Sequence, residues 1–291
     1  MTKRVGIIGG SGLYHIDGLT NKRQKRVKTP FGDPSDELHV GELSGCEVVF
    51  LPRHGRGHRL LPSEINYRAN IWALKKLGVE WIISISAVGS FKKEMKPLDI
   101  VLIDQYFDRT NQGRCHTFFG EGIAAHIMFA HPLCEELRKI IYSVCLEEMD
   151  PSHVHWGGIY LNMEGPAFST RAESLIHKSW GVDVIGMTNM SEARLAREAE
   201  ICYATMAMVT DYDCWIEGDP DTEVNVDMVI QNLNKNADVA RRIIQKSILK
   251  ISKERSCACA SALKNAIITR PDLIPKETLN KLELIVGKYI P

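Results

Sequence analysis

The sequence has no long apolar run, no excess of basic residues and no dense set of cysteines. None of its apolar stretches approaches the roughly 20 consecutive residues of a membrane-spanning helix. The apolar stretch that follows the basic start, MTKRVGIIGG, is too short for a signal peptide. We therefore expect a cytoplasmic protein that makes no use of a membrane.

Charge and cysteine content exclude further classes. Lys and Arg together number 36, as do Asp and Glu, so the formal net charge is zero. A protein that holds nucleic acid usually carries a basic excess, so we expect no nucleic-acid partner and only small, locally bound anions. The eight cysteines are scattered apart from Cys257 and Cys259, which indicates reduced thiols. A bridge between those two would close a strained small ring, which favours free thiols there.

Short apolar segments alternate with longer amphipathic ones. The predicted strands cover residues 5–10, 47–53, 81–86, 99–104, 158–163, 183–187 and 201–209. The predicted helices cover residues 63–78, 132–149, 169–181, 191–200 and 226–252. This alternation predicts an α/β fold with a central mixed, mostly parallel sheet flanked by helices. We expect a single domain over residues 1–291, with a long C-terminal helix and tail (226–291) and a functional or interface loop at 105–131.

Polar or glycine-rich clusters follow most of the predicted strands. They lie at residues 9–12, 53–56, 86–90, 163–166, 187–189 and 210–213. In an open α/β sheet, ligands bind at the carboxyl ends of the strands. Six clusters that meet at one edge of the sheet predict a binding site there better than any single motif does.

Several of these clusters carry groups that can bind an anion. The candidate donors are Ser11, Arg53, His54, Ser86 and Thr188. A guanidinium group can grip a phosphate with two N–H groups, and glycines near Ser11 allow backbone N–H groups to approach it. Other interpretations stay open. Residues 9–12 could form a tight turn, and the run around Arg53 and His54 could be a basic surface loop or supply a metal pair of His54 and His58. Ser86 and Thr188 could cap the helices that follow them.

The run MEGPAFSTRAES is the most distinctive in the chain. Glu164 at a strand end could accept hydrogen bonds from two sugar hydroxyls, as acidic groups do for ribose. Phe168 could stack on a flat ring. Ser169 or Thr170 is expected to cap the next helix, with Glu173 completing a capping box.

Asp211 and Asp213 follow the apolar strand in VTDYDCW. On one strand, residues i and i+2 point the same way, so we expect the two carboxyl groups side by side. A protonated and an ionised carboxyl group could then read the edge of a heteroaromatic base. A metal site, a glycosidase-like acid pair and a solvated pair at the strand end are the alternatives.

Several strings in this sequence together resemble one enzyme family. They are GIIGGSGL, TPFGDPSD, RHGRGH, NYRANIWALKKLG, SAVGS, DQYFDRT, EGPAFSTRAES and ICYATMAMVTDYDCW. Between about residues 4 and 252 the chain closely resembles the S-methyl-5'-thioadenosine phosphorylases, within the trimeric class of purine nucleoside phosphorylases. The tail with CACASALKNAIITRPDLIP looks like that of prokaryotic members, some of which have a C-x-C pair and form hexamers.

The resemblance implies a pentosyltransferase that serves purine and methionine salvage. Its substrates would be S-methyl-5'-thioadenosine and phosphate, and its products adenine and 5-methylthioribose 1-phosphate. It implies no metal or organic cofactor, and assembly as a homotrimer or as a homohexamer made of two trimers. A 6-oxopurine or broad-specificity purine nucleoside phosphorylase is the runner-up. A nucleoside hydrolase and a nucleoside-binding module are the more distant alternatives.

The family's site residues can be carried over one by one. The phosphate site would comprise Ser11, Arg53, His54, Ser86, Ala87 through its N–H group, and Thr188. Met187 would contact the ribose, Phe168 the ring, and Asp211 and Asp213 the base, with Asp211 as the general acid. His126 resembles the histidine that reaches a neighbouring subunit's 5' pocket, while Ser169 and Val226 are specificity positions. Ser11 and Ser86 stand where many members have Thr but keep the hydroxyl group.

Overall fold

The computed structural model describes the chain except for residues 1–2, 11–17, 44, 217–225, 253 and 291, together with the side chain of residue 226. Its strands are β1 (Arg4–Gly9), β2 (Thr20–Lys25), β3 (Leu38–Leu43), β4 (Cys46–Pro52), β5 (Trp81–Ser90), β6 (Ile100–Leu102), β7 (Gln105–Arg109), β8 (Val154–Trp156), β9 (Ile159–Met163), β10 (Val184–Gly186) and β11 (Cys202–Asp211). Its α-helices are α1 (Tyr67–Lys76), α2 (Glu135–Glu148), α3 (Arg171–Ser179), α4 (Asn189–Glu198), α5 (Val226–Lys250) and α6 (Lys276–Val286).

The strands of the described residues form one sheet around β5. β5 pairs in parallel with β1 on one side and with β11 on the other, and its last two residues pair antiparallel with β10. The pairs β1–β4 and β9–β10 are parallel, whereas β2, β3 and β4 form an antiparallel edge. The predicted mixed, mostly parallel sheet is therefore confirmed.

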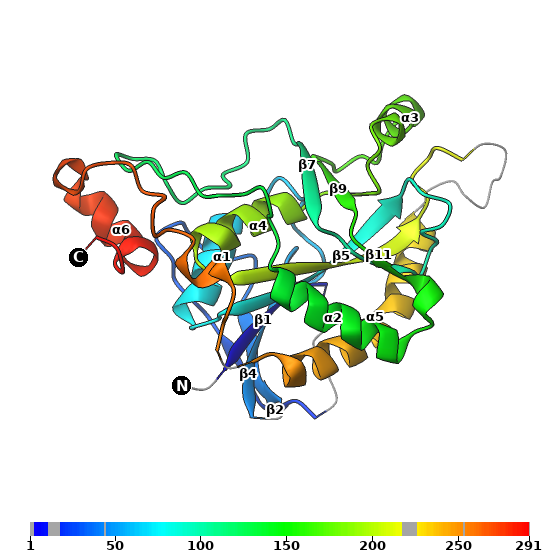
Figure 1. The fold of residues 1–291 in the computed structure, drawn as a ribbon, viewed down its shortest axis with the longest axis horizontal. Helices are drawn as coiled ribbons and strands as arrows, with labels where there is room; N and C mark the ends of the chain where they lie inside the picture. Colours follow the sequence, from blue (N-terminus) through cyan, green and yellow to red (C-terminus); the bar gives the residue numbers. More distant parts are fainter. Residues whose placement is uncertain (1–2, 11–17, 44, 217–225, 253, 291) are drawn as a thin grey trace.

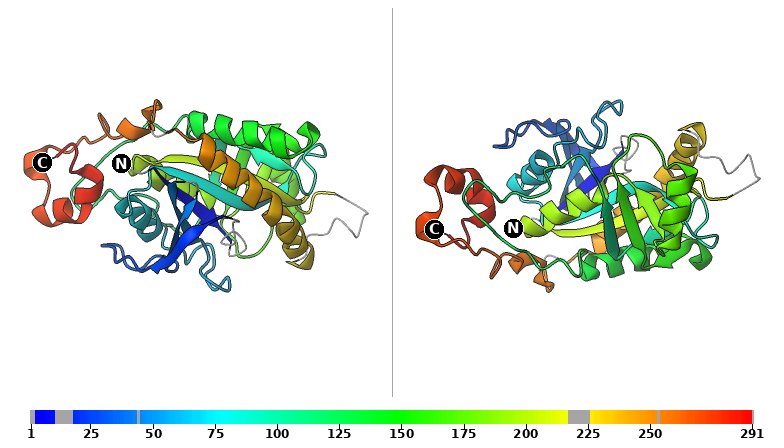
Figure 2. Two further views of the ribbon diagram at one scale, coloured as in Figure 1. Left: turned by 90° about the horizontal axis from the view of Figure 1, so that it is seen from below. Right: turned by 90° about the horizontal axis from the view of Figure 1, so that it is seen from above.

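Side-chain alternation along β5 divides the core into two layers. Trp81 and Ile83 belong to an apolar cluster with residues of α2 and α5, whereas Ile82 belongs to a cluster with residues of α1 and α4. α2 and α5 lie side by side on one face of the sheet, and α1 and α4 lie on the other (Figures 1 and 2). Burial from both faces explains why these strands read as continuous apolar runs.

All the strands and helices predicted from periodicity are present, but other elements were missed. β2 reads TNKRQK and is fully exposed, so it has no apolar pattern and forms only by pairing with β3. The segment 105–131 begins with β7, which pairs with β9, rather than being a loop throughout. α6, at the far end from α3 in Figure 1, was also missed.

Helix starts decide where the polar groups lie. α3 begins after Thr170 with the predicted capping box to Glu173. α4 begins at Asn189, two residues earlier than expected, and its N-cap is Thr188.

No helix in the described part of the chain is both long enough and apolar enough to cross a bilayer.

Candidate active site

A cavity of about 590 Å³ lies at the carboxyl ends of the central strands. The expected site residues that line it are Arg53, His54, Ser86, Ala87, Phe168, Met187, Thr188, Asp211 and Asp213. They come from the ends of β4, β5, β10 and β11 and from the segment between β9 and α3. The clusters that follow separate strands thus meet at one place.

One wall of the cavity offers hydrogen-bond donors at a helix start. The hydroxyl group of Thr188 makes no capping bond to α4, because the side chain of Asn162 accepts from the N–H group of Met190 instead, at 3.0 Å. The interpretation of Thr188 as a simple cap is therefore wrong, and its hydroxyl group has no partner among the described residues. The hydroxyl group of Ser86 lies 3.2 Å from the Tyr160 hydroxyl group. A helix N-terminus with hydroxyl groups beside it is a good environment for an anion.

Arg53 lies beneath this wall and is almost fully buried. Its Nε and Nη2 donate to the carboxylate of Glu192, Nη2 also donates to Ser84 Oγ, and Nη1 donates to the carbonyl oxygen of Ile85. Four of the five guanidinium N–H groups are thereby used, so the expected two-point grip on a phosphate is not available in this conformation. Burial opposes the charge, but the Glu192 carboxylate raises the pKa of Arg53 overall. Arg53 therefore supplies a fixed positive charge and at most one N–H group.

Glu192 is the partner that the sequence analysis missed. It is buried and also accepts hydrogen bonds from Ser84 Oγ at 2.9 Å and from the Tyr203 hydroxyl group at 2.7 Å. A buried carboxylate needs such a full set of donors. Nothing in the sequence indicated this pairing, because a glutamate in the first turn of a predicted helix is common and is usually exposed to solvent.

His54 offers an acceptor rather than the expected donor. Its Nδ1 donates to the carbonyl oxygen of Leu60 at 2.8 Å, so in the neutral ring Nε2 carries the lone pair. Burial lowers the pKa of His54 to about 4, and the positive charge of Arg53 contributes to this. The ring stacks on His58 with centroids 4.1 Å apart, so a metal pair formed by both rings is not favoured in this geometry.

This depressed pKa predicts a measurable pH dependence. The unfolded chain binds a proton at His54 below about pH 6.5, whereas the folded chain does so only near pH 4. Folding stability should therefore fall as the pH drops through this window, by up to about 3 kcal/mol. In a His54→Asn variant, whose amide can still donate to Leu60, the free energy of unfolding from urea titrations should depend less on pH between 7 and 4. Equal pH slopes for the two proteins would contradict the assignment.

Asp211 ends β11 and is held by two short hydrogen bonds. Its Oδ2 lies 2.7 Å from Thr210 Oγ1, and its Oδ1 accepts from the N–H group of Asp213 at 2.8 Å. Burial raises the pKa of Asp211 despite these bonds. Gly89 makes room for the carboxyl group, since a Cβ atom there would lie 2.8 Å from Oδ1.

The two acids do not lie side by side through strand alternation, as the sequence analysis expected. The pairing of β11 with β5 shifts register between Val209 and Asp211. Asp213 lies beyond the strand with a left-handed φ of 51°. A bulge and a turn therefore bring the two residues together, and a backbone N–H group links them.

Asp213 is buried and has an oxygen atom, Oδ2, without a well-formed hydrogen bond among the described residues. Burial raises its pKa, while the nearby hydroxyl groups of Ser174 and Ser169 oppose the rise. The Ser169 hydroxyl group is likewise buried without a partner of good geometry. Ser169 does not line the cavity itself but lies against the acid that does.

Glu164 does not face the cavity, which overturns its expected contact with sugar hydroxyls. It accepts from Arg114 Nε at 2.7 Å and from the N–H groups of Asn111 and Gln112. Arg114 also donates to the carbonyl oxygen of Met187. The ion pair therefore fastens the segment after β7 to the strand ends and positions Met187 in the cavity wall.

The remaining predicted residues lie elsewhere. Ser11 is outside the described residues, as is the side chain of Val226, although its backbone begins α5. His126 is exposed and does not line the cavity. An apolar wall formed by the α5 residues Val229, Ile230 and Leu233 was not predicted, although their helical spacing was the available signal. Phe168 lines the cavity and is 45% exposed, which suits a ring that covers a bound ligand.

Comparison with known proteins agrees with this geometry. Residues 4–248 match the phosphorylase superfamily. The S-methyl-5'-thioadenosine phosphorylase of Geobacter sulfurreducens is 55% identical, with 100% of both chains covered. A methylthioadenosine phosphorylase structure from an antarctic soil metagenomic library has a TM-score of 0.91 at 48% identity, covering 98% of this chain and 99% of that one.

A third relative was solved with a ligand. The methylthioadenosine phosphorylase from Schistosoma mansoni, in complex with adenine, has a TM-score of 0.82 at 39% identity, with 90% of this chain and 96% of that chain covered. The match extends over the sheet and the cavity-lining segments, not over a short motif. The chain therefore belongs to the phosphorylase superfamily and, within it, to the S-methyl-5'-thioadenosine phosphorylase family.

Proposed function

We propose that the chain cleaves S-methyl-5'-thioadenosine with phosphate, releasing adenine and 5-methylthioribose 1-phosphate. The observation that carries this proposal is one cavity with anion-binding groups at one wall and two buried acids at another. A phosphorolysis site needs both, because the nucleophile is an anion and the leaving group is a base that takes up a proton.

Phosphate would lie against Thr188, Ser86 and the Ala87 N–H group, over the fixed charge of Arg53, with Ser11 as a further donor. A neutral His54 would accept a hydrogen bond at Nε2 from the hydroxyl group of a monoanionic phosphate. A dianion close to the ring would instead raise the pKa of His54 and turn it into a donor. Either arrangement gives the nucleophile a bond to His54, and the pH determines which one applies.

Asp211 would protonate the leaving adenine at N7. The glycosidic bond loosens first, the ribose becomes oxocarbenium-like, and the phosphate captures it. The Thr210 hydroxyl group is compatible with a protonated Asp211. It can donate its own proton to the carbonyl oxygen of Val88 at 3.2 Å and accept a hydrogen bond from the Asp211 carboxyl group at 2.7 Å. The raised pKa of Asp211 keeps that proton available at the start of the reaction.

The other residues would set specificity. Phe168 would stack on the purine, Met187 would contact the ribose, and the carboxyl group of Asp213 would accept a hydrogen bond from the 6-amino group. The apolar α5 wall, with Val226 at the start of the helix, is suited to the methylthio group.

We further propose that phosphate is the co-substrate and that no metal or organic cofactor takes part in the reaction. We also propose that the enzyme serves purine and methionine salvage in the cytoplasm.

A homotrimer or a homohexamer is the proposed assembly. The exposed segment around His126 supports a subunit contact, because Met128 beside it is 82% exposed although it is apolar. His126 would then reach the cavity of a neighbouring subunit, which explains why it does not line the cavity of its own chain.

Base release from four nucleosides tests the proposed activity. With phosphate, kcat/KM should be highest for methylthioadenosine, about 10-fold lower for adenosine, about 100-fold lower for methylthioinosine, and about 1000-fold lower for inosine, which lacks both groups. The larger drop is expected because a 6-oxo group cannot donate to Asp213. Equal rates with inosine would indicate a broad-specificity phosphorylase instead, and base release without phosphate would indicate a hydrolase.

A further inference from the structure

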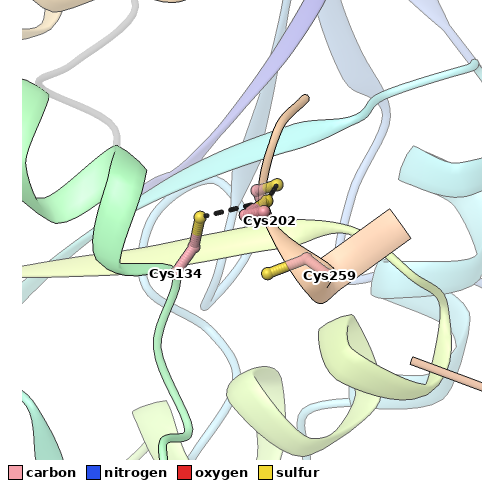
Figure 3. Close-up of side chains that lie close together, drawn as sticks. Cys134, Cys202 and Cys259 are labelled. Atoms are coloured by element: carbon pink, nitrogen blue, oxygen red, sulfur yellow. Dashed lines mark hydrogen bonds between the residues drawn. The ribbon is translucent and has the colours of Figure 1, made fainter. Parts of the chain in front are cut away.

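Four cysteines from distant parts of the sequence meet far from the active-site cavity. Cys134 precedes α2, Cys202 begins β11, and Cys259 lies in the tail after α5 (Figure 3). Cys257 lies two residues earlier in the same tail. Their Sγ atoms all lie within 4.8 Å of one another. They lie at the amino end of β11, whereas Asp211 lies at its carboxyl end, about 30 Å away along the strand.

The distances fit thiols gathered around a point, not disulfides. The Sγ atom of Cys257 is 3.7 Å from that of Cys134 and 3.3 Å from that of Cys202, and all four residues are free thiols. A disulfide requires about 2.05 Å. Four sulfur atoms arranged tetrahedrally around a metal at about 2.3 Å lie about 3.8 Å apart. These two distances are therefore close to those of a tetrahedral thiolate site, and the bound of 4.8 Å on the others is compatible with one.

The surroundings favour thiolates within this group. Cys134 is the N-cap of the 14-residue helix α2 and makes no capping bond with its side chain. The positive end of a helix stabilises a thiolate at that position. Three of the four side chains are buried, so the negative charge has little access to water and needs a cation.

We propose that Cys134, Cys202, Cys257 and Cys259 bind one zinc ion. Four thiolates select zinc over magnesium or calcium, which prefer oxygen ligands. A set of four protein ligands leaves no open position, which is typical of a structural site rather than a catalytic one. Binding releases the remaining thiol protons and involves no change in oxidation state. Zinc sites usually have two to four residues between paired cysteines, so the C-x-C pair here is tighter than is common.

The zinc ion would fasten the tail to the sheet. Beyond the cysteines, the tail bridges Ala125 through Ile267, and the N–H group of His126 donates to the carbonyl oxygen of Ala266 at 2.8 Å. Glu200 holds the same tail through the N–H group of Leu263. Zinc would thus order the start of a segment whose later residues support the loop carrying His126.

Metal analysis of the reconstituted protein tests the proposal. The full chain, purified with a reductant, would be incubated with zinc chloride, freed of excess metal by gel filtration, and analysed by mass spectrometry for metals. We expect about one zinc ion per chain. In a Cys257→Ser/Cys259→Ser variant the ratio should fall at least about 10-fold, whereas Cys115→Ser, which changes an exposed cysteine outside the group, should retain it.

Cobalt gives a readout that does not depend on stability. Co²⁺ bound to the wild-type chain should show thiolate-to-cobalt charge-transfer absorption and the intense visible bands of a tetrahedral site, and zinc should displace it. If the double variant does not fold, Cys259→Ser alone should weaken zinc binding at least about 10-fold in competition with a chelator. A fully reduced, folded wild-type chain that binds no zinc or cobalt would overturn the proposal. So would a disulfide among these four cysteines that persists in the reductant.

Discussion

Asp211→Asn should lower kcat for methylthioadenosine phosphorolysis by about 10²- to 10⁴-fold, the usual contribution of a general acid. The asparagine side chain can still accept from the N–H group of Asp213, which Asp211 Oδ1 does at 2.8 Å, so the local fold should survive. What the variant loses is the transferable proton. Steady-state assays and phosphate binding, measured together, check this.

The controls separate proton donation from damage to the site. Asp272→Asn changes an exposed acid that pairs with Arg270 and does not line the cavity, and it should leave kcat unchanged. In the wild type, kcat should fall as the pH rises through the raised pKa of Asp211, because a general acid acts only while protonated. Asp211→Asn should lose this alkaline limb. A variant that retains at least one third of the wild-type kcat would exclude Asp211 as the acid.

Glu192→Gln should destabilise the fold by about 3–5 kcal/mol, the usual consequence of leaving one member of a buried ion pair without its partner. The carboxylate accepts four hydrogen bonds, two of them from Arg53. Glutamine cannot accept all of these, and its amide group would face the guanidinium donors of Arg53. Urea denaturation at pH 7 measures the loss.

Matched variants identify the cause of that loss. Glu254→Gln, at an exposed position, should change the free energy of unfolding by less than about 0.5 kcal/mol. The double variant Arg53→Met/Glu192→Leu removes both charges and should recover much of the stability while losing phosphate binding. A loss below about 1 kcal/mol in Glu192→Gln would show that Arg53 does not depend on this carboxylate.

The sequence alone located the site, although it did not describe its chemistry correctly. Apolar runs marked β4, β5 and β11, and the polar clusters after them pointed to one edge of the sheet. This worked because strand burial and the residues that end a strand are local features of the chain. The capping box at Thr170 was predicted for the same reason.

Interactions between distant residues could not be read in this way. Arg53 and Glu192 are 139 residues apart in the sequence. We therefore expected the guanidinium N–H groups of Arg53 to be available to a ligand, whereas four of the five donate to other residues of the chain. Glu164 and Arg114 are 50 residues apart, and a sugar contact was expected where an ion pair holds a loop. A charged side chain in a sequence gives no sign of its partner.

The sequence by itself therefore determined the order of the central strands and of the helices that pack on them, the edge at which the polar groups meet, and the family to which the chain belongs. Tertiary structure decided what those groups can do: which N–H groups of Arg53 remain, which nitrogen of His54 is protonated, how Asp213 turns back onto Asp211, and that Cys134 and Cys202 join the tail cysteines. The physical reason is that hydrogen-bond and ligand geometry depends on distances of a few ångströms between segments far apart in the chain. Periodicity in the sequence carries no information on those distances.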